Sequence, residues 1–226
     1  MALERGFFLN FLTIFSIFLL SVPRRSRVLA VEEDDILCLK SIRDSVEDPH
    51  NLLSSWDFRN QTKRPGFICS FTGVECWNQR ENRIISLNLG SLGLKGIFPN
   101  EISYCKSLTS LDLSHNHFYG SIPTNISSML PYLVILSLSS NNFSGEIPTS
   151  LGKCTYLNVL ELDHNGFSGR IPSTIGSLRR INKFSVADNL LVGPVPRFVN
   201  GIRVNASSYA NNPGLCGYPL KPCKDY

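Results

Sequence analysis

Histidines and carboxylates are the first residues to consider, because together they supply acid–base catalysis and metal ligation. Of the four histidines, His115 and His164 share one position, directly before an asparagine that recurs along the chain. Neither has a second histidine or a carboxylate that recurs at the spacing of zinc ligands, so we expect no metal site. No Ser, Cys or Lys stands in a nucleophile motif, and no glycine-rich phosphate loop is present. The sequence therefore predicts a protein with no catalytic machinery and no cofactor.

Cysteine supplies a second kind of chemistry, the disulfide bond. The chain has seven cysteines. In an exported protein such residues pair, and an odd number leaves at least one thiol free. They are Cys38, Cys69, Cys76, Cys105, Cys154, Cys216 and Cys223.

Four Asn-x-Ser/Thr sequons are candidate glycan sites, at Asn60, Asn125, Asn142 and Asn205. Chance alone would produce some of them. Asn142 follows an asparagine that recurs along the chain, and we expect its side chain to face outward.

The N-terminus predicts export. Residues 6–22 are dominated by Phe, Leu and Ile over a length that suits the apolar part of a signal peptide and is short for a membrane span. Small and apolar residues at 28–30 predict cleavage near Ala30, which makes residues 1–30 a signal peptide. An uncleaved signal anchor is the alternative, favoured by three arginines within residues 24–27. In both cases the remaining chain faces outside the cell.

The charge balance beyond residue 30 excludes two classes of partner. This part of the chain carries 18 Lys and Arg against 17 Asp and Glu, with no cluster of basic residues in the sequence. Nucleic acids and anionic membranes attract proteins by releasing counterions to basic groups, so neither is an expected partner. No second apolar stretch of spanning length follows the predicted signal peptide.

A repeat of 24 or 25 residues dominates the chain from Ile84 onward, and its clearest row is LTSLDLSHNHFYGSIP. The alternation around Leu111 and Leu113 is typical of a short strand with one buried face. Stacked rows therefore predict a parallel sheet. The rows begin at Ile84, Leu108, Leu133, Leu157 and Ile181, and we expect strands centred near Leu87, Leu111, Leu136, Leu160 and Phe184.

Two further positions recur in these rows. An asparagine follows each strand where the chain turns, and its amide can bond the free backbone groups of its own and adjacent turns. An apolar residue two positions later predicts a buried stack. The asparagines are Asn116, Asn141, Asn165 and Asn189, and the apolar residues are Phe118, Phe143, Phe167 and Leu191.

These rows resemble the plant-specific leucine-rich repeat, whose pattern is LxxLxLxxNxFxGxIP. The resemblance implies an α/β leucine-rich-repeat solenoid with five repeats at residues 84–202, an N-terminal cap at 31–83 and a C-terminal cap at 203–226. The N-terminal cap includes an amphipathic helix, with Asp34 and Asp35 as its N-cap candidates and Asp48-Pro49 at its end. The resemblance also implies cap disulfides that join Cys69 to Cys76 and Cys216 to Cys223.

The three remaining cysteines are predicted to stay unpaired. Cys105 and Cys154 occupy a row position that is leucine in other rows. Two strand spacings separate them by about 10 Å, beyond the reach of a disulfide, so we interpret both as buried thiols. Cys38 lies in the capping helix. We interpret it as a small buried apolar residue, with a redox or partner-linking role as the alternative.

Several strings narrow the resemblance within the family, among them GFICSFTGVECW, FSVADNLLVGPVP and NNPGLCGYPL. They look like the five-repeat ectodomains of pseudokinase-type receptor-like kinases, which bind somatic-embryogenesis-type co-receptor kinases. The resemblance implies a secreted or cell-surface, non-catalytic binding module that negatively regulates immune or growth signalling. The membrane helix and kinase-like domain of such receptors would follow residue 226, so the chain is expected to be a fragment or a truncated form.

Two other functions share this scaffold. A secreted inhibitor of a cell-wall-degrading enzyme is one alternative, although such inhibitors carry more repeats. The ectodomain fragment of an active receptor kinase is the other.

The outward side chains of the predicted concave sheet are mostly small and polar. Ile135 and Val159 are exceptions in one column on adjacent strands, and Glu161, Asp163 and Lys183 lie beside them. Solenoids of this kind bind proteins on this face, so we predict these five residues to contact a partner. Incidental exposure of two apolar residues is the alternative.

Overall fold

The computed structural model describes residues 24–59 and 65–224. Most of the predicted signal peptide lies outside these residues, as does the sequon at Asn60. The helical elements are α2 (Arg24–Ser45), η1 (Phe67–Ser70), η2 (Asn100–Tyr104), α3 (Ile126–Met129), η3 (Thr149–Lys153), η4 (Ser173–Ser177) and η5 (Ala206–Tyr209), where η marks a 3₁₀-helix.

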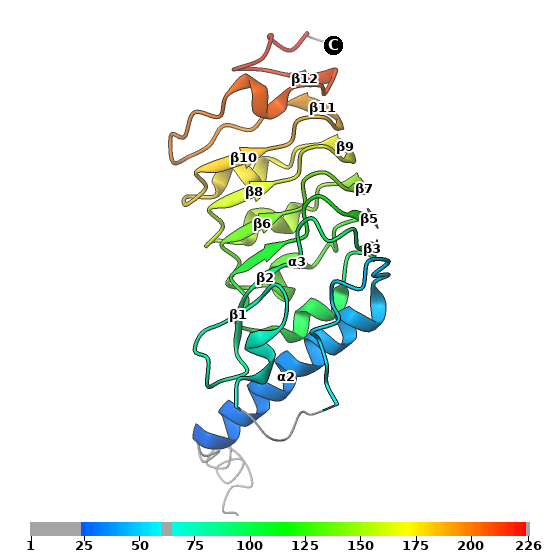
Figure 1. Cartoon of the computed structure of the whole chain (residues 1–226). Coiled ribbons are helices and arrows are strands. Elements are labelled where there is room, and N and C mark those ends of the chain that lie inside the picture. The colour runs from blue at the N-terminus through cyan, green and yellow to red at the C-terminus, as the bar shows by residue number, and fades with distance from the viewer. Residues whose placement is uncertain (1–23, 60–64, 225–226) are drawn as a thin grey trace, which may run out of the picture.

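The strands form two six-stranded sheets along a single solenoid (Figure 1). The first sheet has the order β1 (Val74–Cys76), β2 (Ile84–Asn88), β4 (Ser110–Asp112), β6 (Ile135–Ser137), β8 (Val159–Glu161) and β10 (Lys183–Ser185). The second has the order β12 (Gly214–Cys216), β11 (Leu190–Pro194), β9 (Gly166–Arg170), β7 (Asn142–Glu146), β5 (His117–Gly120) and β3 (Lys95–Ile97).

The five predicted strands all form, in the predicted register. Leu87, Leu111, Leu136, Leu160 and Phe184 are successive Cα partners across the first sheet. Every pair of strands in that sheet is parallel except β1 with β2, which is antiparallel. The parallel leucine-rich-repeat sheet is therefore confirmed, because a repeat of constant length brings equivalent residues of successive rows side by side.

The core runs the whole length of the solenoid. The strand leucines are buried, and the rings of Phe118, Phe143 and Phe167 stack with centroids 6.1 and 6.2 Å apart. Each such side chain contributes about 1.5–3 kcal/mol through burial.

An asparagine ladder joins the rows. The Asn189 side chain donates to the carbonyls of Leu162, Val186 and Ala187 and accepts from the amide of Phe167. Asn116, Asn141 and Asn165 bond in the same way. The structure adds a rung that the sequence analysis missed, because Asn212 donates to Val186 and accepts from Leu191. The C-terminal cap therefore begins as a shortened sixth row.

The capping helix differs from its predicted bounds. It begins at Arg24, so Asp34 and Asp35 lie inside it and are not N-caps. The residues before them include good helix formers such as Leu, Ala and Glu, which let the helix extend further back. The buried Asp35 carboxylate instead accepts the amide of Ile84 at 2.9 Å, which ties the helix to β2. Asp48 lies beyond the helix and accepts the amides of Leu52 and Leu53.

The cysteine pairs include one that was not predicted. Cys69 is joined to Cys76 and Cys216 to Cys223, as the family resemblance implied. Cys38 is joined to Cys105, with their Cα atoms 5.6 Å apart, so the interpretation of these two as unpaired residues was wrong. The strand-spacing argument considered only a partner on the sheet, whereas α2 packs on η2 and brings Cys38 to Cys105. Cys154 is free and buried, and burial raises its pKa to about 11.

Candidate protein-binding surface

The predicted partner-binding residues lie on the first sheet. Ile135, Val159 and Lys183 are successive Cα partners at the start of β6, β8 and β10. Ile135 is exposed at 36% and Val159 is half-buried. The two apolar side chains therefore adjoin on one face, with a lysine on the next strand.

Lys183 also contacts Glu161, which lies two residues along β8 from Val159. The Lys183 Nζ atom is 2.6 Å from the Glu161 carboxylate, and this hydrogen bond raises the pKa of the lysine. An exposed pair of this kind adds at most about 1 kcal/mol to stability. Its consequence for binding is that each charge partly neutralises the other beside the apolar residues.

Two exposed tyrosines missed by the sequence analysis lie in the same two rows as Ile135 and Val159. Tyr132 and Tyr156 are exposed at 53% and 41%, and their ring centroids are 6.1 Å apart. They precede Ile135 and Val159 by three residues in their respective rows. Their shared place directly before the first leucine of a row was the signal that could have found them. We call Tyr132, Ile135, Tyr156 and Val159 the apolar strip.

An arginine extends the strip on the following row. The Arg180 guanidinium lies 5.2 Å from the centroid of the Tyr156 ring, a cation–π distance. The strip thus combines two aromatic rings, two aliphatic side chains and a cation. Aromatic residues and arginine are the residues most often responsible for affinity at protein interfaces.

Comparison with known proteins shows the family of this chain. The leucine-rich-repeat N-terminal domain family matches residues 32–77, and the leucine-rich-repeat family matches residues 107–129, 132–154 and 156–178. The crystal structure of the BIR2 ectodomain from Arabidopsis thaliana matches with a TM-score of 0.80 and 46% identity, covering 83% of this chain and 96% of that one. This chain belongs to the BIR-type family of leucine-rich-repeat receptor kinase ectodomains.

Other relatives agree with this membership. A chain of the crystal structure of the BIR3–SERK2 complex from A. thaliana matches with a TM-score of 0.78 and 46% identity, covering 84% of this chain and 100% of the matched one. A probably inactive leucine-rich repeat receptor-like protein kinase of A. thaliana is 53% identical over 88% of this chain. The inactive receptor-like kinase BIR2 is 55% identical over 58% of it. The chain spans 32% and 21% of these two proteins.

Asp163, the fifth predicted contact residue, belongs to a polar network. Its carboxylate accepts from Ser139 at 2.8 Å and lies 3.0 Å from the His164 ring. The second ring nitrogen of His164 lies 3.3 Å from Asp188. Burial would raise the pKa of Asp163, but the hydrogen bonds from His164, Ser139 and Ser185 outweigh it and hold the pKa below 3.8. Asp163 is therefore ionised and already engaged within the protein.

This lowered pKa predicts a pH-dependent contribution to stability. A carboxylate whose pKa falls on folding stabilises the native state above its unfolded pKa, and this stability is lost as the pH falls through the folded value. We expect Asp163→Asn to be less stable than the parent at pH 6, with a difference that shrinks below pH 3.8. Urea unfolding between pH 2 and pH 7 measures this. Asp44→Asn, at an exposed helix position, is the control, and a gap for Asp163→Asn that is constant with pH would contradict the assignment.

Three predicted glycan sites lie in the described residues. Asn125, Asn142 and Asn205 are all exposed. Asn142 begins β7 in the second sheet, away from the apolar strip. Their use as glycan sites stays a prediction.

Among the residues that the structure describes, no three His, Cys, Asp or Glu side chains gather as metal ligands would. None of the helices in this part of the chain combines the length and the apolar character needed to cross a bilayer.

Proposed function

We propose that this chain is a non-catalytic, extracellular recognition module that binds the ectodomain of a SERK-type co-receptor kinase through the apolar strip. By occupying the co-receptor, it would keep that kinase from ligand-binding receptors and so restrain signalling. The observation that carries the proposal is the apolar strip itself, in which two exposed tyrosines with adjacent rings precede the paired Ile135 and Val159 in the same two rows.

Two features of the strip favour a protein partner. The rings lie too far out to support the core, because both tyrosines are more than 40% exposed while the leucines that follow them are buried. Exposed aromatic and aliphatic groups gain free energy when a partner removes them from water, at about 25 cal/mol per Å². The relationship to BIR3, solved in a complex with SERK2, supports a co-receptor ectodomain as that partner.

The names of two relatives support a function without catalysis. The curated relatives BIR2 and a second receptor-like protein are named inactive and probably inactive kinases. The repeats themselves form a scaffold of leucines and asparagines. The side-chain amides of the asparagines are engaged in bonds that join one row to the next.

Removing the strip tests the proposal. We expect Tyr132→Ser/Tyr156→Ser, and separately Ile135→Asp/Val159→Asp, to weaken binding to the SERK2 ectodomain at least 30-fold, because buried interface anchors contribute about 2 kcal/mol or more. Calorimetric titration of the secreted proteins measures the affinity. Melting temperatures should change little, since outward side chains have few core neighbours.

The control is Tyr119→Ser, which removes an equally exposed tyrosine from β5 in the second sheet. It should bind the SERK2 ectodomain as tightly as the parent. Strip variants that fold normally and keep the parent affinity would overturn the proposal. A parent chain that binds SERK2 without competing with a ligand-binding receptor ectodomain would overturn only the inhibitory part.

A further inference from the structure

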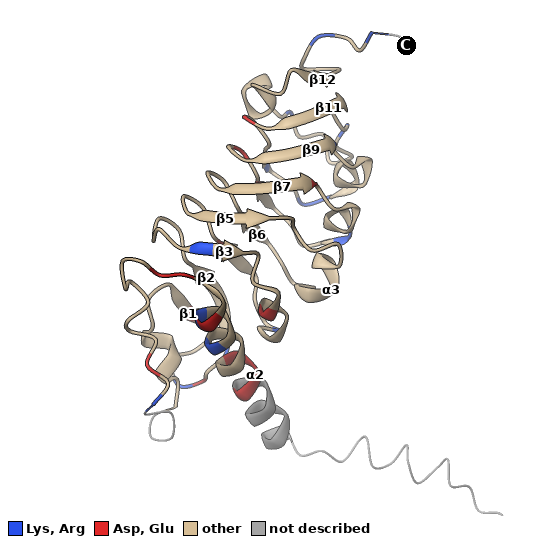
Figure 2. Ribbon diagram, turned by 90° about the vertical axis from the view of Figure 1, so that its right-hand side faces the viewer, with Lys and Arg blue, Asp and Glu red and all other residues tan. Residues whose placement is uncertain are grey.

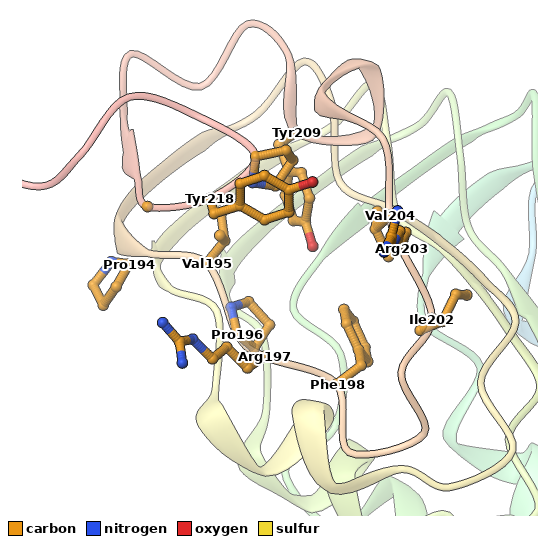
Figure 3. Close-up of a pocket in the computed structure, with 12 residues that line it drawn as sticks. Pro194, Val195, Pro196, Arg197, Phe198, Ile202, Arg203, Val204, Tyr209 and Tyr218 are labelled. Carbon is orange, nitrogen blue, oxygen red and sulfur yellow. The ribbon is translucent and has the colours of Figure 1, made fainter.

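A cavity of about 440 Å³ lies in the C-terminal cap, away from the apolar strip. Figure 3 shows its walls: Tyr209 and Tyr218 lie along one side, the segment Pro194–Phe198 along a second and Ile202–Val204 along a third. In the sixth row η5 packs against β10 in place of a further strand of the first sheet, and Tyr209 at the end of η5 lines the cavity.

The floor of the cavity is apolar. Tyr209 and Val195 are buried, and the Phe198 ring packs against Phe184 with centroids 5.4 Å apart. Burial raises the pKa of Tyr209 to about 12, so its phenol is neutral at physiological pH. Tyr218 is 82% exposed at the rim, where its ring could cover an inserted group.

The rim of the cavity is basic. Arg197 and Arg203 line it, and both are exposed. Within the described part of the chain neither arginine forms an ion pair. Two unpaired guanidinium groups beside an apolar hollow favour a ligand with carboxylates, which arginine binds through paired hydrogen bonds.

The basic rim is part of an uneven distribution of charge along the chain. The two parts of the chain beyond residue 30 carry opposite net charges, although their sum is close to zero. From residue 170 to the C-terminus the sequence has eight Lys and Arg against two Asp and Glu, whereas residues 31–169 have ten against fifteen. Because the solenoid keeps sequence order in space, the C-terminal end carries an excess of basic over acidic residues (Figure 2). The resulting field attracts acidic ligands to this end.

We propose that the C-terminal cap holds a second binding site, for an acidic peptide segment that inserts one large apolar side chain between Tyr209, Phe198 and Val204 and pairs its carboxylates with Arg197 and Arg203. The site is separate from the apolar strip and does not depend on co-receptor binding. A peptide fits better than a membrane or an anionic polysaccharide, because those would engage the arginines but leave the apolar cavity unfilled.

The test uses a short probe and three forms of the chain. The probe is the fluorescein-labelled, C-terminally amidated peptide Asp-Glu-Phe-Glu-Asp-Gly, and its binding is followed by fluorescence anisotropy. One matched peptide replaces Phe by Ser, and another replaces every acid by its amide. The variants are Arg197→Glu/Arg203→Glu and the control Lys106→Glu/Lys153→Glu, which makes the same change of charge at exposed positions in the repeats.

We expect the parent and the control to bind the probe within twofold of each other. The charge reversal at Arg197 and Arg203 should weaken binding at least tenfold, as should either change in the peptide. SERK2 binding by this variant should equal that of the parent, which separates this site from the apolar strip.

Three outcomes would overturn the inference. One is no binding of the probe by the parent chain, and another is equal binding by the charge-reversed variant. The third is a Ser-containing peptide that binds as well as the probe while polygalacturonate or phosphatidylserine vesicles displace both. That result would show a general anionic surface with no use of the cavity.

Discussion

Replacement of Asn189 by leucine is expected to lower the free energy of unfolding by about 3–5 kcal/mol. The Asn189 side chain is 4% exposed, and it bonds three backbone carbonyls and the amide of Phe167. Leucine has a similar volume but bonds none of them. Each buried backbone group left without a partner costs about 1–3 kcal/mol, and the costs are only partly additive.

The loss should spread beyond one row. In a solenoid each repeat is stabilised by its neighbours, so a broken rung weakens the contact between the rows on either side. Asn189 bonds both its own row and the preceding one, through Val186 and Leu162. We therefore expect the C-terminal rows to unfold before the N-terminal rows in Asn189→Leu, which hydrogen exchange can resolve.

Urea unfolding measures the total effect, with Asn182→Ala as the control. Asn182 is exposed and lies in the same row, so its replacement should change the unfolding free energy by less than about 0.5 kcal/mol. If Asn189→Leu cost less than 1 kcal/mol, the ladder would not be a main source of stability.

Removal of the Cys38–Cys105 disulfide is the second large effect. The bond joins residues 67 apart in the sequence. Loop-closure entropy for that separation corresponds to about 4 kcal/mol, against about 2 kcal/mol for a seven-residue loop. We expect Cys38→Ala/Cys105→Ala to lose about 4 kcal/mol, and alanine leaves no reactive thiol at either position.

The C-terminal cap provides the matched comparison. Cys216 and Cys223 are only seven residues apart, so Cys216→Ala/Cys223→Ala should lose about half as much. Denaturant unfolding of both variants under identical oxidising conditions measures the difference. An equal or larger loss at the C-terminal cap would contradict the larger contribution expected from the Cys38–Cys105 disulfide.

The sequence could predict the strand centres from Leu87 to Phe184 and the four asparagines of the repeats. Each of them is determined by the order of residues within a row and by the length of the row. Alternation at Leu111 and Leu113 sets which side chains face inward, and a constant row length sets which rows meet. Neither depends on distant parts of the chain. Ile135 and Val159 could be placed on the outward face of the first sheet for the same reason.

Other features depend on how the ends of the chain fold back, which no repeat specifies. Cys38 meets Cys105 only because α2 packs across η2, and Asp35 accepts the amide of Ile84 only because the same helix lies against the first row of the repeats. Asn212 joins the ladder although the cap around it has lost the row pattern.

The two proposed binding surfaces likewise combine features set by the repeat with features set by packing. The periodic sequence by itself determined the scaffold and the column of Ile135 and Val159, since both follow from counting residues within and between rows. Only the tertiary structure decided that the rings of Tyr132 and Tyr156 are exposed and lie next to each other, and that Arg197 and Arg203 stand unpaired at the rim of a cavity. Exposure and ion pairing are set by what lies nearby in space, and at row edges and caps that is settled by packing.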